Sequence, residues 1–492
     1  MGIFVAYMLG IYDYITPFEL DADEGNNLIK ALLLDRGFKF GSSIWSDQPP
    51  AFSYLLWWTM KIAGWSVTAS RVVVILFSGI AVMVTYFSVC VAFNRVSPSP
   101  LAHVAAISGS LLLIFSARYM HYSAAVMIGL PAISLMMLGT LSLTTWLRTE
   151  SPRYLLAAGL LMGASVSVKM FTAFLPVLFM AAIALLSWRR QAGRSFWHPV
   201  KLQALFWTAF TVALVVALLP LVLQWSFTDL VQPHRIARTT HHGTFDGSIR
   251  IRQFVQQDLA LFILAALGVI RAAMTRNVSM LLWAIWLISG VGVLSTHTPV
   301  WSHHRILLTA PGAILAGYFL GEIAGVVVRR IPAKASRFAP LLPVVLAVGV
   351  IFLFHPDVLR TATRGTPWSY NQRDIAAQKV IDAYRPQIRF MVTARQMYAF
   401  RAMRPVPPDL AVTSIKRFGA GMLTAEQIIE DIRVYEPEMV VLCDRWPPKV
   451  RRAVRAAIID TYALVYENRE NRKTQIWVLK RNDATSAPMP VQ

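Results

Sequence analysis

The sequence predicts a polytopic α-helical membrane protein that ends in a separate α/β domain. Of its 492 residues, 56% are hydrophobic and only 15% are charged, and the mean hydropathy is +0.51. Soluble domains are far more polar. Apolar stretches of the length that crosses a bilayer, roughly 17–25 residues, recur through residues 1–354, whereas residues 355–492 have a mixed composition. We therefore expect a transmembrane domain at 1–354 and a second domain at 355–492.

About eleven membrane-spanning helices are expected. The N-terminal stretch, Met1–Tyr12, is too short to cross alone and lacks the basic region and cleavage site of a signal peptide. We interpret it as the remnant of a first helix whose start is misassigned. The other stretches lie at 69–93, 100–117, 123–147, 154–168, 170–188, 202–225, 255–273, 277–296, 306–328 and 338–354.

Lys and Arg residues predict the orientation of these helices. If the spans alternate, the most basic short loops fall on one side, which is expected to be cytoplasmic. The acidic first loop, residues 13–50, and the C-terminal domain then face outward, into the periplasm if the chain lies in a bacterial inner membrane. The basic residues in question are Arg148, Arg153, Arg189, Arg190, Arg194, Lys201, Arg271, Arg276, Arg329, Arg330, Lys334 and Arg337.

The C-terminal domain is expected to be a layer of strands and helices. Its excess of Lys and Arg suits contact with anionic lipid headgroups or acidic polysaccharide, although a solvated basic surface explains the same excess. No motif points to nucleic acid. Strands are expected at Ile388–Ala394, Met439–Cys443, Ala463–Tyr466 and Thr474–Leu479, and helices at Ile375–Ala383, Ala425–Tyr435 and Lys449–Tyr462.

The first outer loop places acidic side chains beside the membrane, where they are costly without a function. Asp21, Asp23 and Glu24 precede an amphipathic segment, residues 24–36, that suits a helix lying in the membrane interface. Helix capping is one explanation, since Asp21 with Glu24 three residues later matches a capping box. Capping needs only one acidic pair, however, and three acids are present.

Further polar side chains are expected on the same outer face. Asp47 and Gln48 come just before Pro49-Pro50, a pair that favours the start of a helix. Lys169 lies in the turn between two closely spaced apolar stretches, where extension of its ammonium toward the interface is the simple alternative to a binding role. The remaining candidates on this face are Arg118, Tyr122, His303, His304 and Arg305, and His234, His241 and His242 form an irregularly spaced candidate for a metal site.

The arrangement resembles the GT-C superfamily of integral-membrane glycosyltransferases, in the branch of protein O-mannosyltransferases and lipid A aminoarabinose transferases. The resemblance rests on Asp23-Glu24 in the first outer loop, on Gln48-Pro49-Pro50 before a juxtamembrane helix and on Lys169. Pro299–Arg305 and Arg404–Leu410 also look like stretches of bacterial members. The chain departs from many relatives in Tyr122–Pro131, which contains no acidic residue. No cofactor is firmly implied, and this departure makes dependence on a divalent metal doubtful.

The resemblance implies a sugar donor linked to polyprenyl phosphate and an acceptor hydroxyl on a lipid, glycan or protein, with inversion at the anomeric carbon. Asp23 is then the candidate base, expected to be ionised beside a helix N-terminus without a strongly raised pKa, and Glu24 orients it or the acceptor. Asp47 and Gln48 are candidates for the sugar. Lys169 and the group of His303, His304 and Arg305 are candidates for the phosphate, with Arg118 and Tyr122 as weaker ones.

Two other classes of protein are compatible with many spans and intramembrane charges. A transporter or flippase tends to show repeated halves with broken helices, and no such repeat is found in the sequence. A lipid-linked oligosaccharide ligase or polymerase usually carries a long outer loop late in the membrane domain, instead of an acidic first loop. The transferase is therefore the favoured prediction.

Overall fold

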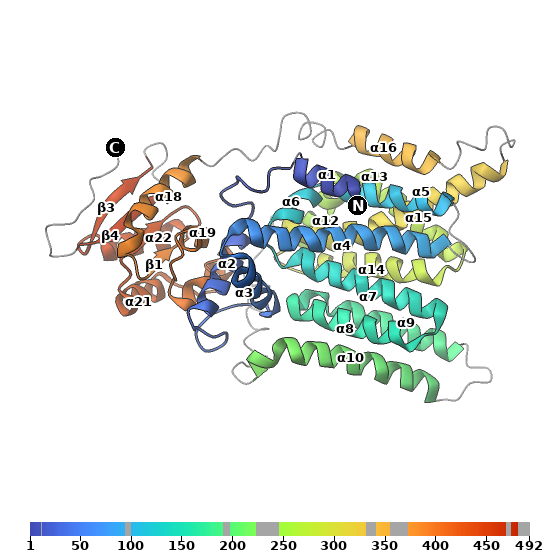
Figure 1. Ribbon diagram of the computed structural model, residues 1–492, viewed down its shortest axis with the longest axis horizontal. Coiled ribbons are helices and arrows are strands. Elements are labelled where there is room, and N and C mark those ends of the chain that lie inside the picture. The colour runs from blue at the N-terminus through green and yellow to red at the C-terminus, as the bar shows by residue number, and fades with distance from the viewer. Residues whose placement is uncertain are drawn as a thin grey trace.

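The computed structural model consists of a long helical bundle and a smaller α/β domain that lies at one end of it (Figure 1). The structure describes residues 1–10, 12–93, 100–189, 197–222, 246–330, 341–354, 372–468 and 474–480. The predicted domain boundary at residue 355 and the predicted metal-site residues His234, His241 and His242 lie outside these ranges.

Each expected apolar stretch corresponds to a helix of the bundle. By length and composition, five described helices qualify alone as membrane spans, or six if the pair bent by 97° between Gly247–Gln257 and Leu259–Met274 is one span. The expectation of about eleven spans is therefore not reached by this criterion, because several of the apolar helices are shorter than 18 residues. The helices are α1 (Gly2–Gly10), α4 (Val67–Phe93), α5 (Pro100–Ile114), α7 (Gly129–Thr149), α8 (Pro152–Val168), α9 (Phe174–Arg189), α10 (Trp197–Val222), α13 (Leu259–Met274), α14 (Val278–Thr296), α15 (Ile306–Arg330) and α16 (Leu342–Phe354).

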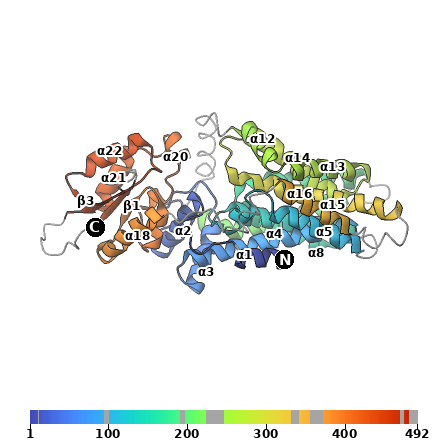
Figure 2. The same cartoon turned by 90° about the horizontal axis from the view of Figure 1, so that it is seen from above.

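Shorter helices gather at the end of the bundle that faces the α/β domain. Helix α2 (Ala22–Asp35) belongs to the first outer loop and helix α3 (Ala51–Ala63) follows it, and both lie between the two parts of the molecule (Figure 2). Pro50 is the N-cap of α3, as the Pro49-Pro50 pair predicted. The other short helices are α6 (Tyr119–Ala124), η1 (Met170–Thr172), α12 (Gly247–Gln257) and η2 (Ser302–Arg305).

The C-terminal domain contains a four-stranded mixed sheet in the order β1-β2-β4-β3. Strands β1 (Met391–Thr393) and β2 (Met439–Leu442) are parallel, and β4 (Gln475–Leu479) pairs antiparallel with both β2 and β3 (Tyr462–Glu467). All four strands and three helices were predicted. Two short helices, α19 and α20, were not. The helices are α18 (Gln372–Tyr384), α19 (Gln396–Arg401), α20 (Ile415–Gly419), α21 (Ala425–Tyr435) and α22 (Pro448–Ile458), with 3₁₀ turns at Arg385–Gln387 and Pro408–Ala411.

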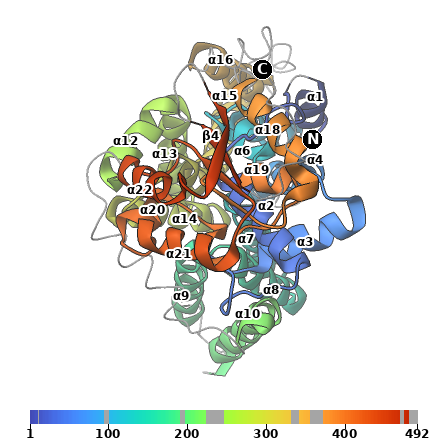
Figure 3. The same cartoon turned by 90° about the vertical axis from the view of Figure 1, so that its left-hand side faces the viewer.

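The C-terminal domain packs on the first outer loop, chiefly through α19 and α2 (Figure 3). Glu19 of the loop is nearly fully buried and accepts hydrogen bonds from Arg395 at 2.6 Å and Arg445 at 2.5 Å. The Arg401 guanidinium lies 4.8 Å from the centre of the Phe18 ring and donates to the Phe18 carbonyl. Because these charged groups are paired and desolvated together, they stabilise one defined arrangement of the two parts.

Candidate active site

A cavity of about 760 Å³ opens between the bundle and the C-terminal domain. One wall comes from α2 and the loop before α3, and another from the ends of the bundle helices near Met127–Gly129, Lys169–Phe171 and His297–His304. The third wall belongs to the C-terminal domain. Of the sequence-predicted site residues, the lining contains Asp23, Asp47, Gln48, Lys169, His303 and His304.

Asp21 and Asp23 have different roles at the start of α2. Asp21 is the N-cap, and its side chain accepts a hydrogen bond from the Asp23 N–H at 3.0 Å, so the expected capping is present. Asp23, in contrast, lines the cavity. Burial raises the pKa of Asp23, and the Asp47 carboxylate raises it further, whereas Lys169 and Lys30 oppose the shift. The expectation of a pKa without a strong upward shift omitted this burial and the second carboxylate.

The other member of the predicted pair, Glu24, is turned away from the cavity. Its carboxylate accepts from the Arg71 guanidinium at 3.0 and 2.8 Å, and both side chains are fully buried. It also accepts from the backbone N–H groups of Leu20, at 2.6 Å, and Val126, at 2.9 Å. The predicted capping box therefore does not form, since Glu24 binds the N–H of Leu20 instead of that of Asp21.

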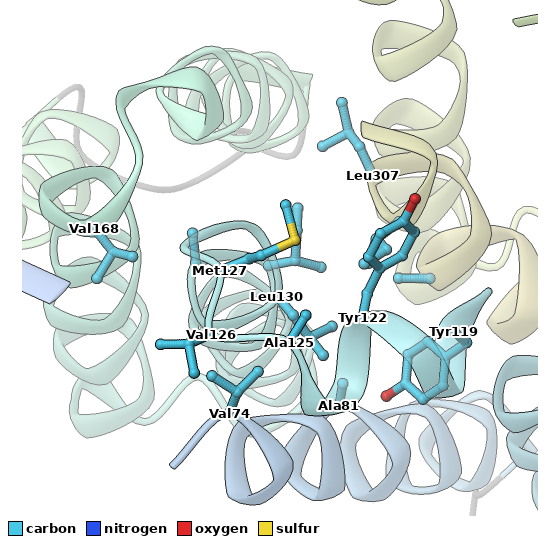
Figure 4. Close-up of a cluster of buried hydrophobic side chains, with 14 of the residues drawn as sticks. Val74, Ala81, Tyr119, Tyr122, Ala125, Val126, Met127, Leu130, Val168 and Leu307 are labelled. Carbon is cyan, nitrogen blue, oxygen red and sulfur yellow. The ribbon is translucent and has the colours of Figure 1, made fainter. Parts of the chain in front are cut away.

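The Glu24 ion pair ties the first loop to the interior of the bundle. The segment that contains Val126 and Met127 lies in the buried hydrophobic cluster of Figure 4, together with Val74 and Leu130. Arg71 also donates to the carbonyls of Tyr14 and Pro17. Glu24 thus accepts four hydrogen bonds. Because Glu24 is the next residue after Asp23, these bonds also fix the position of the Asp23 backbone.

Asp47 forms an ion pair across the domain boundary. Its Oδ2 is 2.6 Å from the Nζ of Lys416 in α20. Gln48 lines the cavity beside it and is held by a turn in which its N–H donates to the Ser46 hydroxyl at 3.2 Å. The cavity therefore includes a charged pair that neither part of the molecule makes alone.

Two buried lysines of the bundle side face the acidic residues. Lys169 follows the last residue of α8 and is 8% exposed, and Lys30 of α2 is 4% exposed. Burial lowers the pKa of Lys169 to about 8, while Asp23 and Asp47 oppose the shift. Burial also lowers the pKa of Lys30, again opposed by Asp47 and Asp23. The low exposure of Lys169 does not fit a side chain extended into the surroundings.

His303 and His304 lie together at the start of the segment that leads into α15. Their ring centroids are 4.6 Å apart, and His304 stacks on Phe171 with the centroids at 5.2 Å. The Trp301 N–H donates to Nδ1 of His304 at 3.2 Å. Because Nδ1 of His304 accepts this hydrogen bond, the His304 imidazole is neutral and offers its Nε2–H as a donor.

The remaining candidates do not line the cavity. Arg305 is buried beside the cavity, 3.6 Å from the Asp258 carboxylate and 5.2 Å above the ring of Phe254. Tyr122 contacts the ring of His303, with centroids 6.5 Å apart, without lining the cavity itself. Arg118 precedes α6 in the left-handed conformation, with φ of 62°. The structure therefore gathers six of the ten predicted residues into the cavity and leaves Glu24, Arg305, Arg118 and Tyr122 behind or beside it.

Sequence reasoning expected Asp21 only as a cap, and it missed four further charged residues that share this cavity, namely Lys30, Lys416, Asp444 and Arg445. The spacing of Lys30 after Asp23, two helical turns along one face, was a usable signal. Nothing local marked the residues from the C-terminal domain. Over the described ranges, no group of three or more His, Cys, Asp or Glu side chains is arranged to hold a metal ion.

Residues 47–225 match the family described as dolichyl-phosphate-mannose-protein mannosyltransferase. In structure, the chain is similar to ArnT from Cupriavidus metallidurans bound to undecaprenyl phosphate, with a TM-score of 0.65 and 15% identity over 97% of each chain. The apo state of the same protein gives a TM-score of 0.60, also at 15% identity over 97% of each chain. No match among curated proteins is found.

A further similar structure is the archaeal oligosaccharyltransferase AglB from Archaeoglobus fulgidus in complex with an inhibitory peptide and a dolichol-phosphate. Its TM-score is 0.52 at 11% identity, over 99% of this chain and 74% of AglB. The chain thus shares its fold with ArnT and AglB, and the fold that the resemblance implied is confirmed.

Proposed function

We propose that the chain is an inverting glycosyltransferase that moves a sugar from a polyprenyl-phosphate donor to a hydroxyl group of a lipid, glycan or protein acceptor. The observation that carries the proposal is that a half-buried carboxylate, Asp23, and a buried lysine, Lys169, line one cavity and influence each other's charge. The similarity in fold to a protein bound to undecaprenyl phosphate supports this choice of donor class.

Asp23 acts as the general base. The acceptor oxygen attacks the anomeric carbon while its proton passes to the Asp23 carboxylate, and the bond between that carbon and the phosphate oxygen breaks on the opposite face. A raised pKa suits this task, because a base is most effective when its pKa lies near the working pH. Glu24 acts on Asp23 through the backbone, since its own oxygens are taken by Arg71 and two N–H groups.

The leaving phosphate needs cations and hydrogen-bond donors more than it needs a general acid. Lys169 supplies a positive charge, and the Nε2–H group of His304 is a neutral donor on the same wall, beside the ring of His303. Asp47 and Gln48 belong to the wall formed by α2 and the loop before α3, where they bind hydroxyl groups of the sugar. Asp23 thus acts on the acceptor, and each of the other cavity-lining candidates contacts one part of the donor.

The cavity and the C-terminal domain are assigned to the periplasmic side of a bacterial inner membrane, on the distribution of Lys and Arg in the loops. Accessibility labelling of single cysteines checks this orientation. A Cys at Ser486 should react with an impermeant reagent in intact cells, whereas Cys at Arg190 or Lys334 should react only after the inner membrane is opened. The reverse pattern contradicts the assignment.

The function is tested with the purified protein and a panel of polyprenyl-phosphate sugars, by following transfer of the labelled sugar to cell-envelope lipid, glycan and protein fractions. Asp23→Asn should lower turnover by about 100- to 10,000-fold and leave donor binding intact. Asp13→Asn is the matched control, since Asp13 is a half-buried acid of the same loop that does not line the cavity and accepts hydrogen bonds from Ile15 and Thr16. If Asp23→Asn turns over at the wild-type rate, Asp23 is not the general base. If the protein moves the intact donor across the membrane without transferring the sugar, it is a flippase.

A further inference from the structure

Lys416 reaches the active-site cavity from the C-terminal domain. Its side chain is 11% exposed and its Nζ lies 2.6 Å from Asp47, which belongs to the loop between α2 and α3 of the membrane domain. Both residues line the cavity that also contains Asp23. An ion pair this close and this shielded is strongly coupled, because little water is present to screen it.

The short helix that carries Lys416 is fixed on the same loop. The next residue, Arg417, stacks over Trp45 with its guanidinium carbon 4.3 Å from the ring centroid, and it forms a two-bond pair with Asp409 at 2.7 and 2.8 Å. The Ser414 side chain caps the helix. Arg417 thus contacts Trp45 while Lys416 contacts Asp47. These two contacts hold the Lys416 ammonium at a defined place in the cavity wall.

Without a cation beside it, the Asp47 carboxylate would oppose the ionisation of Asp23. After burial, its negative charge is the largest influence that raises the pKa of Asp23. Two carboxylates in one shielded cavity resist simultaneous ionisation, and a cation on one of them relieves the other. Asp23 and Asp47 are faced by further charged or titratable groups, namely Asp21, Lys30, Lys169, His297, His303, His304, Arg417, Asp444 and Arg445.

We propose that Lys416 is a positioning residue for catalysis, supplied by the C-terminal domain: its ammonium holds Asp47 and balances the charge of that carboxylate, so that Asp23 stays ionised and able to accept a proton. The inference rests on the proposed function, in which Asp23 is the base. It gives the C-terminal domain a direct part in the reaction, since the domain completes the charge arrangement of the cavity.

The test follows the protonation of Asp23 in the full-length protein. Dicyclohexylcarbodiimide reacts with protonated, shielded carboxyl groups, and mass spectrometry of the labelled peptide gives the pH of half-labelling of Asp23. In Lys416→Met this pH should rise by roughly one unit or more, whereas Lys416→Arg should stay near the wild type. Arg433→Met is the control, because Arg433 is an exposed basic residue of the same domain, paired with Glu430.

A second variant shows whether the effect passes through Asp47. Adding Asp47→Asn to Lys416→Met should return the half-labelling pH of Asp23 to the wild-type value or below it. If Lys416→Met does not yield folded protein, the comparison of Asp47→Asn with Asp47→Asn plus Lys416→Met carries the test, and the two should agree. Unchanged labelling in Lys416→Met, or a shift that persists without the Asp47 charge, overturns the inference.

Activity separates this inference from the function on which it rests. In Lys416→Met, the acidic limb of the rate profile should move to higher pH by the same amount as the labelling, with turnover recovered at alkaline pH. An equal loss of rate at every pH, without a labelling shift, indicates a merely structural lysine. If the wild-type protein transfers no sugar but Lys416→Met still shifts the half-labelling pH of Asp23, the proposed function is contradicted. The influence of Lys416 on Asp23 through Asp47 is then still supported.

Discussion

Glu24 and Arg71 form an ion pair from which water is fully excluded, with two hydrogen bonds of 3.0 and 2.8 Å. The pair lies directly behind Asp23, so the predicted Asp23-Glu24 motif separates into one side chain that faces the cavity and one that faces the bundle. The acid in the second position is thus used to hold the first loop against α4. This arrangement explains why two adjacent acids are needed where capping requires one.

Breaking this pair should strongly destabilise the protein. Arg71→Met leaves the Glu24 carboxylate buried without its cation, and such a change costs about 3–5 kcal/mol. The matched control is Lys61→Met, which removes a half-exposed pair with Asp35 and should cost no more than about 1 kcal/mol. Thermal unfolding in detergent compares the two. Similar unfolding temperatures for both variants contradict the structural role of Glu24.

The pH dependence of transfer should be bell-shaped. Asp23 must be ionised to accept a proton, so the rate falls as the pH drops through its raised pKa. Lys169 must be protonated to hold the phosphate, so the rate also falls as the pH rises through about 8. Measuring kcat/KM from acidic to alkaline pH checks both limbs. An acidic limb at the ordinary pKa of an aspartate indicates an exposed base.

The Lys169 side chain should act mainly on the donor. Lys169→Ala removes a charge that contacts the phosphate before and during its departure, so donor KM should rise together with a loss of kcat. Lys169→Arg should keep part of the activity and lose the alkaline limb of the profile, because a guanidinium does not titrate in this range. A lower unfolding temperature with an unchanged donor KM, in Lys169→Ala, removes this residue from the site.

Much of the architecture follows from local pattern. The apolar stretches are long enough to show each bundle helix, and the strands β1 to β4 alternate or carry runs of branched side chains that mark them without tertiary information. Asp23, Asp47 and Lys169 were found because charge beside hydrocarbon is costly and therefore informative. The count of spans is lower than the number of apolar stretches because four apolar helices of the described ranges have fewer than 18 residues.

The C-terminal wall of the cavity was not predictable in the same way. Helices α19 and α20 have six and five residues, too short for any periodicity to appear. Lys416 meets Asp47, and Arg445 meets Glu19, over more than 360 residues of intervening sequence. The raised pKa of Asp23 also depends on tertiary packing, since its causes are burial and the carboxylate of Asp47 from the far end of the same outer loop.

Gly25 sets how closely the two parts of the molecule approach. A Cβ at this position would lie 2.5 Å from the Met397 backbone nitrogen and 3.1 Å from the Gln396 carbonyl carbon, and backbone atoms cannot rotate away. Gly25→Ala should therefore push α19 from α2 and carry Lys416 and Arg445 out of the cavity. Helix propensity acts in the opposite direction, because alanine is favoured over glycine by about 1 kcal/mol inside a helix.

A loss of transfer activity in Gly25→Ala would therefore result from the disturbed contact between α2 and α19, and not from a weakened α2 helix. Hydrogen exchange of the α2 and α19 amides should become faster, and transfer should fall even though every residue that lines the cavity is retained. Gly292→Ala is the matched control, since this glycine of α14 has no atom within 4 Å of the added Cβ. Equal exchange and equal turnover in both variants contradict close packing of the C-terminal domain on the first loop, and with it the contribution of that domain to the site.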